Sequence, residues 1–289
     1  MARTDTSRNH LRLRNRKFAV GLLRGAAGAL IFGIPMLMTM ELWFLGFYME
    51  RERLLLLLVI NIPMLVLIAH RIGFEPTFTW REAVRDAFIA YGLGIITSAL
   101  VLGLLGVLSH DQSAPELLGK IALQAVPASL GAMLGRSQLG GRDDNEDEHQ
   151  NDPATQELST GYGGELFLMA VGALFLNLNI APTEEIIAIS FKMSFWHGLA
   201  AVLVSVMLMH GFVYAVAFRG AHSLTPEVPM WHALVRFTLP GYVVTSAISL
   251  YVLWTFGRLD DVTITQALMF MIVLNFPGAI GAAAARLIL

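Results

Sequence analysis

Hydrophobic and polar positions alternate along this chain on the scale of whole helices. Apolar runs of about 20 residues, the length of a helix that crosses the hydrocarbon core of a bilayer, are separated by shorter polar segments. The runs fall at residues 19–47, 54–70, 86–108, 117–135, 164–190, 197–218, 233–256 and 265–287. The pattern predicts an all-α membrane protein with eight transmembrane helices.

The pattern of the first half recurs in the second half. Trp80, Arg85 and Tyr91 correspond to Trp231, Arg236 and Tyr242 at an offset of 151, and Pro127, Gly131, Ala132 and Arg136 correspond to Pro277, Gly281, Ala282 and Arg286 at an offset of 150. Four crossings bring each half back to the side it started from, so the two repeats are expected to be parallel. The expected domains are a basic arm at 1–18, four-helix repeats at 19–136 and 164–289, and an acidic linker at 137–163.

Composition agrees with a bilayer environment. Hydrophobic residues make up 55% of the chain, charged residues only 15%, and the mean hydropathy is +0.61. A soluble domain of this size lacks the polar residues to cover its surface at such a composition. The absence of cysteine excludes disulfides and thiolate metal sites. No nucleic-acid motif is present, and the acidic linker lacks the glycine and final glutamate of an EF-hand loop.

Basic residues favour one orientation. An amino terminus in the cytoplasm places 15 of the 20 Lys and Arg residues on the inner side or at adjoining helix ends, which is the positive-inside pattern. The five exceptions are Arg51, Arg53, Lys120, Lys192 and Arg258. We therefore expect both termini in the cytoplasm.

The first helix of each repeat carries the unusual residues. Each has a proline inside an apolar run, Pro35 in the first and Pro182 in the fifth. A proline inside a helix removes a backbone hydrogen bond and frees a carbonyl oxygen, so we expect both helices to be broken. Aligning Thr-x-Glu in the two helices pairs Thr39 and Glu41 with Thr183 and Glu185 at an offset of 144.

Carboxylates in these helices suggest a cation or proton site. An acidic residue at the centre of a transmembrane helix costs about 2.5–3.5 kcal/mol, although the glutamates can also lie at the interface because both helices are long. The candidate ligands or proton carriers are Glu41, Glu184, Glu185, Asn177, Asn179, Thr39 and Thr183, with Pro35 and Pro182 opening the helices. Two carboxylates held close together would raise the pKa of one of them, which would suit proton coupling.

The leading hypothesis is a channel or transporter for a small cation or proton. The expected partners are the lipid bilayer and that ion, with no nucleic acid and no cofactor. The sequence leaves open whether the chain forms a homo-oligomer. One alternative is an intramembrane enzyme of the glutamate-dependent type that cleaves prenylated proteins. Its Glu-Glu-x-x-x-Arg motif has Ile189 at the arginine position here, and His210 lies outside any matching spacing. A membrane scaffold that transports nothing is the other alternative.

The chain resembles a family of prokaryotic integral membrane proteins that is catalogued as a domain of unknown function. The resemblance rests on the basic arm, the run from Pro35 to Trp43, the segment at 177–185 and the end from Pro277 to Arg286. It implies a location in the bacterial cytoplasmic membrane. It implies no activity, so the functional hypothesis depends on the residues themselves.

Overall fold

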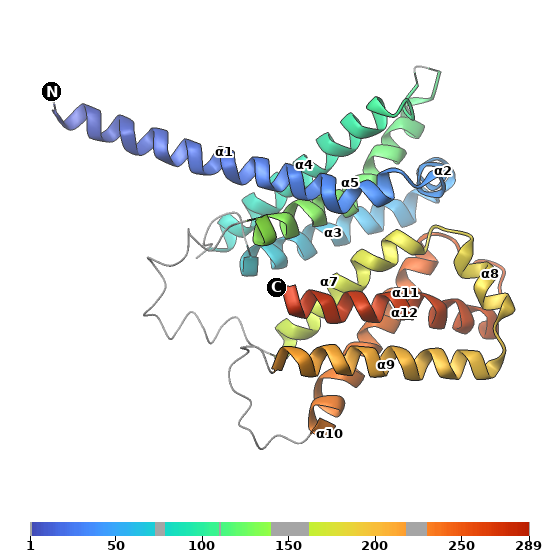
Figure 1. The fold of residues 1–289 in the computed structure, drawn as a ribbon. Helices are drawn as coiled ribbons and strands as arrows, with labels where there is room; N and C mark the ends of the chain where they lie inside the picture. The colour runs from blue at the N-terminus through green and yellow to red at the C-terminus, as the bar shows by residue number, and fades with distance from the viewer. Residues whose placement is uncertain (1, 73–78, 110, 140–161, 218–229, 289) are drawn as a thin grey trace. The chain divides into compact units, whose positions relative to one another are not determined.

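The computed structural model describes residues 2–72, 79–109, 111–139, 162–217 and 230–288 (Figure 1). Every regular element in these residues is a helix, and eight helices are long and apolar enough to cross a membrane. The eight spans are Phe18–Leu37, Arg51–His70, Trp80–Leu104, Ala114–Gly135, Tyr162–Ile180, Phe195–Phe212, Trp231–Thr255 and Ile264–Ala285. The prediction of an all-α protein with eight transmembrane helices is therefore confirmed.

The helices divide into two compact units. Unit 1 comprises residues 1–39 and 56–149, and unit 2 comprises residues 40–55 and 150–289. Unit 1 contains α1 (Ala2–Leu37), most of α3 (Arg51–Ile72), α4 (Trp80–Leu104) and α5 (Ala114–Leu139). Unit 2 contains α2 (Met40–Tyr48), the first turn of α3, α7 (Tyr162–Ile180), α8 (Glu185–Lys192), α9 (Phe195–Ala217), α10 (Met230–Ala233), the π-helical turn η2 (Leu234–Thr238), α11 (Leu239–Thr255) and α12 (Ile264–Ile288).

One segment belongs to a different unit from the helix that precedes it. The segment 40–55 follows the first long helix in sequence, yet it belongs to unit 2. The predicted acidic linker lies mostly outside the described residues, as do the side chains of Arg136 and Arg286. The predicted boundaries of the two repeats stay a prediction.

Capping side chains start several helices. Thr79 precedes α4, and its side chain accepts a hydrogen bond from the Glu82 backbone N–H. Before α12, the Thr263 backbone N–H donates to Gln266 Oε1 at 3.1 Å, and the Gln266 N–H donates to Thr263 Oγ1 at 3.3 Å. This reciprocal pair is a capping box, which satisfies N–H groups that the first turn leaves without helical partners.

Unit 1 is built around α5, which packs against both α1 and α4. A Cβ atom added to Gly28 on α1 would lie 2.4 Å from the Gly131 carbonyl oxygen on α5. A Cβ atom on Gly94 of α4 would lie 2.7 Å from the Ala125 carbonyl oxygen, also on α5. The backbones of three helices therefore touch, as small residues permit in membrane proteins.

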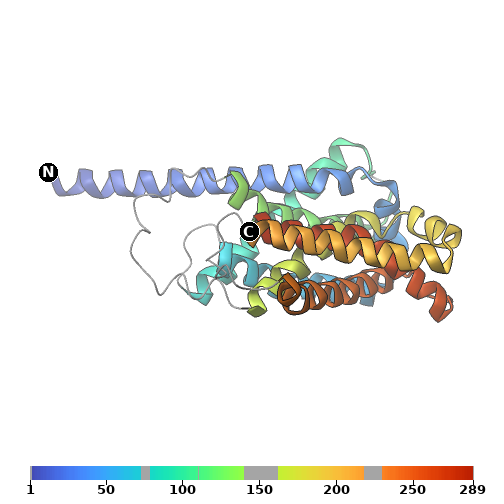
Figure 2. The ribbon, with the colours of Figure 1, turned by 60° about the horizontal axis from the view of Figure 1, so that its bottom comes forward.

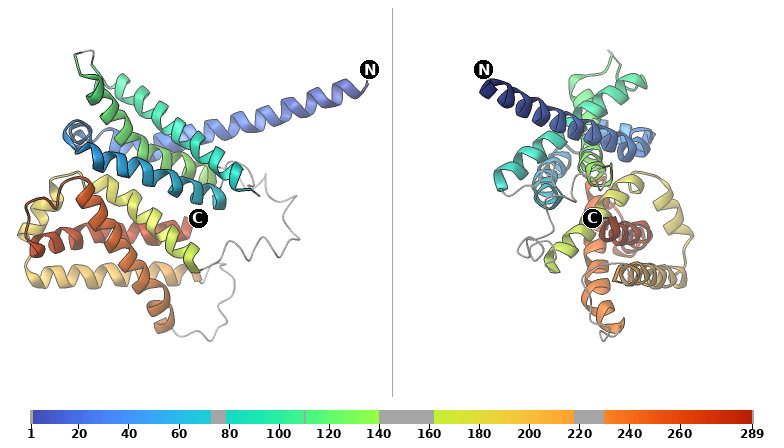
Figure 3. Two further views of the ribbon diagram at one scale, coloured as in Figure 1. Left: turned by 180° about the vertical axis from the view of Figure 1, so that it is seen from behind. Right: turned by 60° about the vertical axis from the view of Figure 1, so that its left-hand side comes forward.

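Unit 2 is built around α12, which packs against α7, α9 and α11. Figures 2 and 3 show α9 and α12 running side by side. A Cβ atom on Gly172 of α7 would lie 2.1 Å from the Gly281 carbonyl oxygen of α12. An apolar core that includes Met169, Met209 and Ala282 fills the space beside this contact.

Candidate functional site

The first helix break follows Pro35. α1 ends at Leu37 and α2 begins at Met40, so the chain leaves helical geometry soon after the proline. The Thr39 hydroxyl donates to the Pro35 carbonyl oxygen at 2.6 Å. The buried side chain of Gln124 donates through Nε2 to the Met36 carbonyl oxygen at 3.0 Å. Neutral side chains of unit 1 therefore donate hydrogen bonds to the Pro35 and Met36 carbonyl oxygens at this break.

The second helix break surrounds Pro182. α7 ends at Ile180 and α8 begins at Glu185, so the predicted run from 164 to 190 is interrupted around Pro182, as expected from the proline. Arg258 reaches this break from the connection between α11 and α12. Its Nη2 donates to the Pro182 carbonyl oxygen, and its Nη1 pairs with Glu184 Oε1 at 3.0 Å.

All three candidate glutamates lie outside the eight candidate spans, in the segments next to the breaks. Glu41 is half-buried, whereas Glu184 and Glu185 are exposed. A hydrogen bond from the Thr183 hydroxyl and another from its own backbone N–H hold the pKa of the Glu185 carboxyl below its ordinary value. The Glu185 carboxyl therefore gives up its proton more readily than an ordinary glutamate does.

The candidate neutral ligands serve different local roles. Asn179 donates through Nδ2 to the Phe175 carbonyl oxygen at 3.1 Å, and the Thr183 hydroxyl lies 2.9 Å from the Ile180 carbonyl oxygen. The Asn179 contact caps the end of α7, and the Thr183 hydroxyl lies beside it, next to Glu185. Asn177 is fully buried and donates through Nδ2 to Ser249 Oγ of α11 at 2.9 Å. Of the candidate residues with neutral side chains, Asn177 is therefore the one that links α7 to another helix.

A line of polar residues on α11 and the end of η2 faces the interior of unit 2. Its members are Thr238, Tyr242, Thr245, Ser246 and Ser249, and their spacing places them on one face of the helix. We call these five residues the polar face of α11. Thr238 Oγ1 lies 3.0 Å from His210 Nδ1 of α9.

The two serines at the other end of the polar face bond to further helices. Ser246 accepts from Asn275 Nδ2 of α12 at 2.7 Å, and Ser249 accepts from Asn177 of α7. Together with the His210 contact, the polar face therefore contacts α9, α12 and α7 in turn. Hydroxyl and amide groups extend over about 16 Å of helix between Thr238 and Ser249.

The orientation of the buried Asn275 amide is fixed by its partner. The Ser246 hydroxyl donates its proton to the Tyr242 carbonyl oxygen at 2.9 Å. Ser246 Oγ can therefore only accept from Asn275, so the amide nitrogen faces Ser246 and the amide oxygen points elsewhere. Among the described residues, the amide oxygens of Asn275 and Asn177 have no hydrogen-bond partner, although both side chains are buried.

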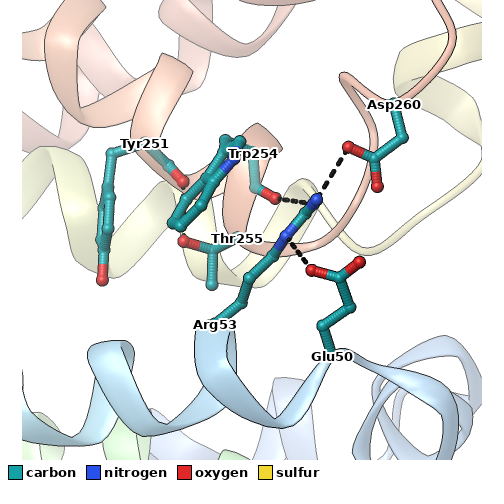
Figure 4. Close-up of polar contacts among 6 residues, drawn as sticks. All are labelled: Glu50, Arg53, Tyr251, Trp254, Thr255 and Asp260. Carbon is teal, nitrogen blue, oxygen red and sulfur yellow. Dashed lines mark hydrogen bonds and ion pairs between the residues drawn. The ribbon is translucent and has the colours of Figure 1, made fainter.

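A second arginine, Arg53, joins the first turn of α3 to the end of α11. Arg53 Nη1 donates to the Trp254 carbonyl oxygen at 2.6 Å, and Nη2 donates to Asp260 Oδ1 at 2.9 Å. Arg53 Nε lies 2.7 Å from Glu50 Oε2, and the guanidinium lies 5.0 Å from the centre of the Trp254 ring (Figure 4). All of these contacts lie within unit 2.

The sequence had not assigned roles to these two arginines, although it did carry a signal. Arg53, Lys120 and Arg258 are exceptions to the positive-inside pattern, and each pairs with a carboxylate: Arg53 with Glu50 and Asp260, Lys120 with Glu116, and Arg258 with Glu184. Three of the five basic residues outside the predicted inner side therefore form ion pairs, although the sequence pattern did not identify their partners.

The glutamate-dependent enzyme hypothesis gains no geometric support from these contacts. Glu184 precedes α8 and pairs with Arg258, while His210 lies far along α9 and contacts Thr238. From Phe195 at the start of α9 to His210 the helix rises by about 22 Å. In the part of the chain that the structure describes, no three His, Asp or Glu residues gather as metal ligands would.

Comparison with known proteins identifies the family. The model of the family described as "Putative integral membrane protein (DUF2391)" matches residues 21–289, and the chain belongs to this family. No curated protein and no solved structure matches the chain. The predicted resemblance to a membrane protein family of unknown function is confirmed.

Proposed function

Starting from membership of an integral membrane protein family, we propose that this protein passes protons or a small cation through unit 2, along the polar face of α11. The observation that carries the proposal is the place of the buried Asn177 and Asn275 amides beside the hydroxyl groups of that face. Their amide oxygens have no hydrogen-bond partner among the described residues, a property that Asn61 and Gln124 of unit 1 share without such a row of hydroxyl groups. An unpaired buried acceptor costs about 1–3 kcal/mol. Polar groups within transmembrane helices are costly to bury, which favours a functional role for them.

The spacing of the oxygen atoms supports a continuous path. Thr238, Tyr242, Ser246 and Ser249 follow one another at intervals of three or four residues, which is about 4.5–6 Å along the helix axis. Asn275 and Asn177 add amide oxygens from the facing helices. Neutral oxygens in this arrangement can replace the hydration of a small cation or relay a proton.

The glutamates beside the breaks would collect cations at one end of the path. Glu41, Glu184 and Glu185 all belong to unit 2 and lie outside the candidate spans. Fixed carboxylates raise the local concentration of cations at a pore entrance. In this proposal Thr39, Thr183 and Asn179 hold the shape of the breaks, and Pro35 and Pro182 create them.

The duplication read from the sequence forms part of the proposal. Gly28 approaches Gly131 in unit 1, and Gly172 approaches Gly281 in unit 2. These residues are related by offsets of 144 and 150, the same offsets that relate the sequence motifs. We further propose parallel repeats in the bacterial cytoplasmic membrane with both termini inside, on the strength of the positive-inside pattern.

The test is ion flux in proteoliposomes that contain purified protein. We expect Asn275→Ala to reduce flux of protons or of Na⁺, K⁺ or Ca²⁺ by roughly tenfold, the effect of losing one interaction of about 1.4 kcal/mol. The matched control is Asn61→Ala in unit 1, because Asn61 also donates from a buried amide to a serine, Ser129, at 3.0 Å. Wild-type flux in folded Asn275→Ala would contradict the proposed path.

A further inference from the structure

Arg258 occupies the two acceptors that a free cation would use at the second break. Its guanidinium binds the carbonyl oxygen of Pro182, which the break exposes, and the carboxylate of Glu184. One carbonyl oxygen and one carboxylate form an oxygen-rich site of net charge −1. The positive charge in that site comes from the chain itself.

This contact lies directly beyond the polar face of α11. Asn177 and Ser249 join α7 to α11 by a hydrogen bond, and Pro182 and Arg258 join the segments that follow these same two helices. From Asn177 to the end of α7 at Ile180 the helix rises by about 4.5 Å. The side chain of Arg258 is 14% exposed and that of Glu184 is 72% exposed, so the guanidinium lies on the inner side of the pair.

We infer that Arg258 is a tethered cation that closes a monovalent cation site formed by the Pro182 carbonyl oxygen and the Glu184 carboxylate at the end of the path. This inference rests on the proposed function and adds its regulation. A permeating cation of charge +1 replaces the guanidinium without changing the net charge of the site. Removing the guanidinium opens the site.

Among the described residues, Arg258 pairs with fewer carboxylates than Arg53 does. Its partner is Glu184, whereas Arg53 pairs with both Glu50 and Asp260. Each arginine donates through Nη1 and Nη2 and leaves a buried Nε–H without a hydrogen-bond acceptor in the described part of the chain. The second carboxylate and the Trp254 ring, 5.0 Å from the guanidinium, hold Arg53 in addition, so Arg258 is the less strongly held of the two.

The first experiment compares flux in proteoliposomes of wild-type protein, Arg258→Ala and Arg53→Ala. We expect Arg258→Ala to raise the flux of a monovalent cation several-fold. Arg53→Ala removes the same charge from the same end of unit 2 without opening the Pro182 site, so it should not raise flux. Unchanged or lower flux in folded Arg258→Ala would overturn the inference.

The second experiment measures the site without relying on transport. Guanidinium ion at millimolar concentration should raise the thermal unfolding midpoint of Arg258→Ala, because a ligand that binds only the folded state stabilises it. The double variant Arg258→Ala with Glu184→Gln should lose this rescue. Equal responses in all variants would overturn the site, whereas rescue without flux in any variant would overturn the proposed function and leave the site intact.

Discussion

The two units use the same kind of helix contact and fill the space beside it differently. In unit 1, α4 approaches α5 through Gly94, with no side chain between the backbones. In unit 2, the position at the offset of 151 from Gly94 is Thr245, which belongs to the polar face of α11. The room for it comes from Gly278, where an added Cβ would lie 2.9 Å from Thr245 Cγ2 and 2.7 Å from Asn177 Oδ1.

Two further positions of the polar face differ between α4 and α11 in the same way. Ala87 and Ile95 of α4 stand where α11 has Thr238 and Ser246, while tyrosine and serine occur in both helices as Tyr91 and Tyr242, and Ser98 and Ser249. Ala87 is buried and allows close packing in unit 1, whereas Ile95 is exposed. In the proposed function, the additional hydroxyl groups of unit 2 line the path.

The two helix breaks also differ in the charge of the groups that bind their carbonyl oxygens. The carbonyl oxygens at the first break are satisfied by neutral groups, the Thr39 hydroxyl and the Gln124 amide. The second break is held by the charged guanidinium of Arg258. A neutral cap stabilises a helix end, whereas a charged group can be exchanged for an ion.

We expect the largest effect from adding a Cβ atom at the close contacts that glycines make between the helices of each unit. We expect Gly172→Ala, and likewise Gly28→Ala, to destabilise the fold by more than about 2 kcal/mol, because each new Cβ would overlap a carbonyl oxygen of the facing helix. Thermal unfolding in detergent measures the change.

The controls for this prediction are Gly163→Ala in unit 2 and Gly92→Ala in unit 1. An added Cβ at either position has no neighbour within 4 Å. Alanine favours a helix by up to about 1 kcal/mol over glycine, so the controls should be neutral or stabilising. Destabilisation of equal size at all four glycines would show that the close contacts are not what matters.

The next effect concerns the arginine contact of unit 2. Arg53→Lys keeps the charge but loses the planar fork that reaches Glu50, Trp254 and Asp260 together. We expect it to cost about 1–3 kcal/mol, since hydrogen bonds to charged groups contribute in this range. Thermal unfolding of purified protein measures the loss.

The matched variant for the arginine contact lies in unit 1. Lys120 pairs with Glu116 one helical turn away on α5, at 2.8 Å. The Lys120 side chain is only 9% exposed and that of Glu116 is 20% exposed, so Lys120→Gln leaves a largely buried carboxylate without its ionic partner. We expect it to cost about 1–3 kcal/mol as well, and a neutral effect would show that the pair does not stabilise unit 1.

The fold could be predicted from the sequence because the length of an apolar run is enough to predict a membrane-spanning helix. The eight spans and the breaks near Pro35 and Pro182 correspond to local features of the chain. The partners of Arg53 and Arg258 did not follow, because Asp260 lies 207 residues from Arg53 and Glu184 lies 74 residues from Arg258. Local patterns cannot pair such distant residues.

The polar face of α11 was readable in part. Its serines and threonines recur at helical spacing, but hydroxyl groups in membrane helices often bond back to their own helix. Thr245 does so, donating to the Gly241 carbonyl oxygen at 2.9 Å. The distinguishing residues are Asn177 and Asn275, which come from two other helices, so the cluster appears only when the helices are packed.

The smallest effect concerns the charge at the second break. Thr183→Val removes the hydroxyl that lowers the pKa of Glu185, so the pKa should rise toward its ordinary value. A group with a lowered pKa stabilises the fold above its ordinary pKa, and this contribution is lost as the pH falls through the lowered value. Thr183→Val should therefore lower stability above the ordinary glutamate pKa and reduce the stability that is lost on acidification. NMR titration of labelled glutamate measures the shift, and an unchanged Glu185 pKa would contradict the assigned cause.

The most direct test of the central claim compares two serines at equivalent positions. Ser249 of α11 accepts from Asn177 on the proposed path, and Ser98 of α4 is buried in the closely packed unit 1. Flux should be measured for Ser249→Ala and Ser98→Ala in parallel proteoliposomes, with folding checked in each. The account predicts that Ser249→Ala lowers ion flux severalfold and that Ser98→Ala leaves it at the wild-type rate. Equal flux in the two variants would contradict a path through unit 2.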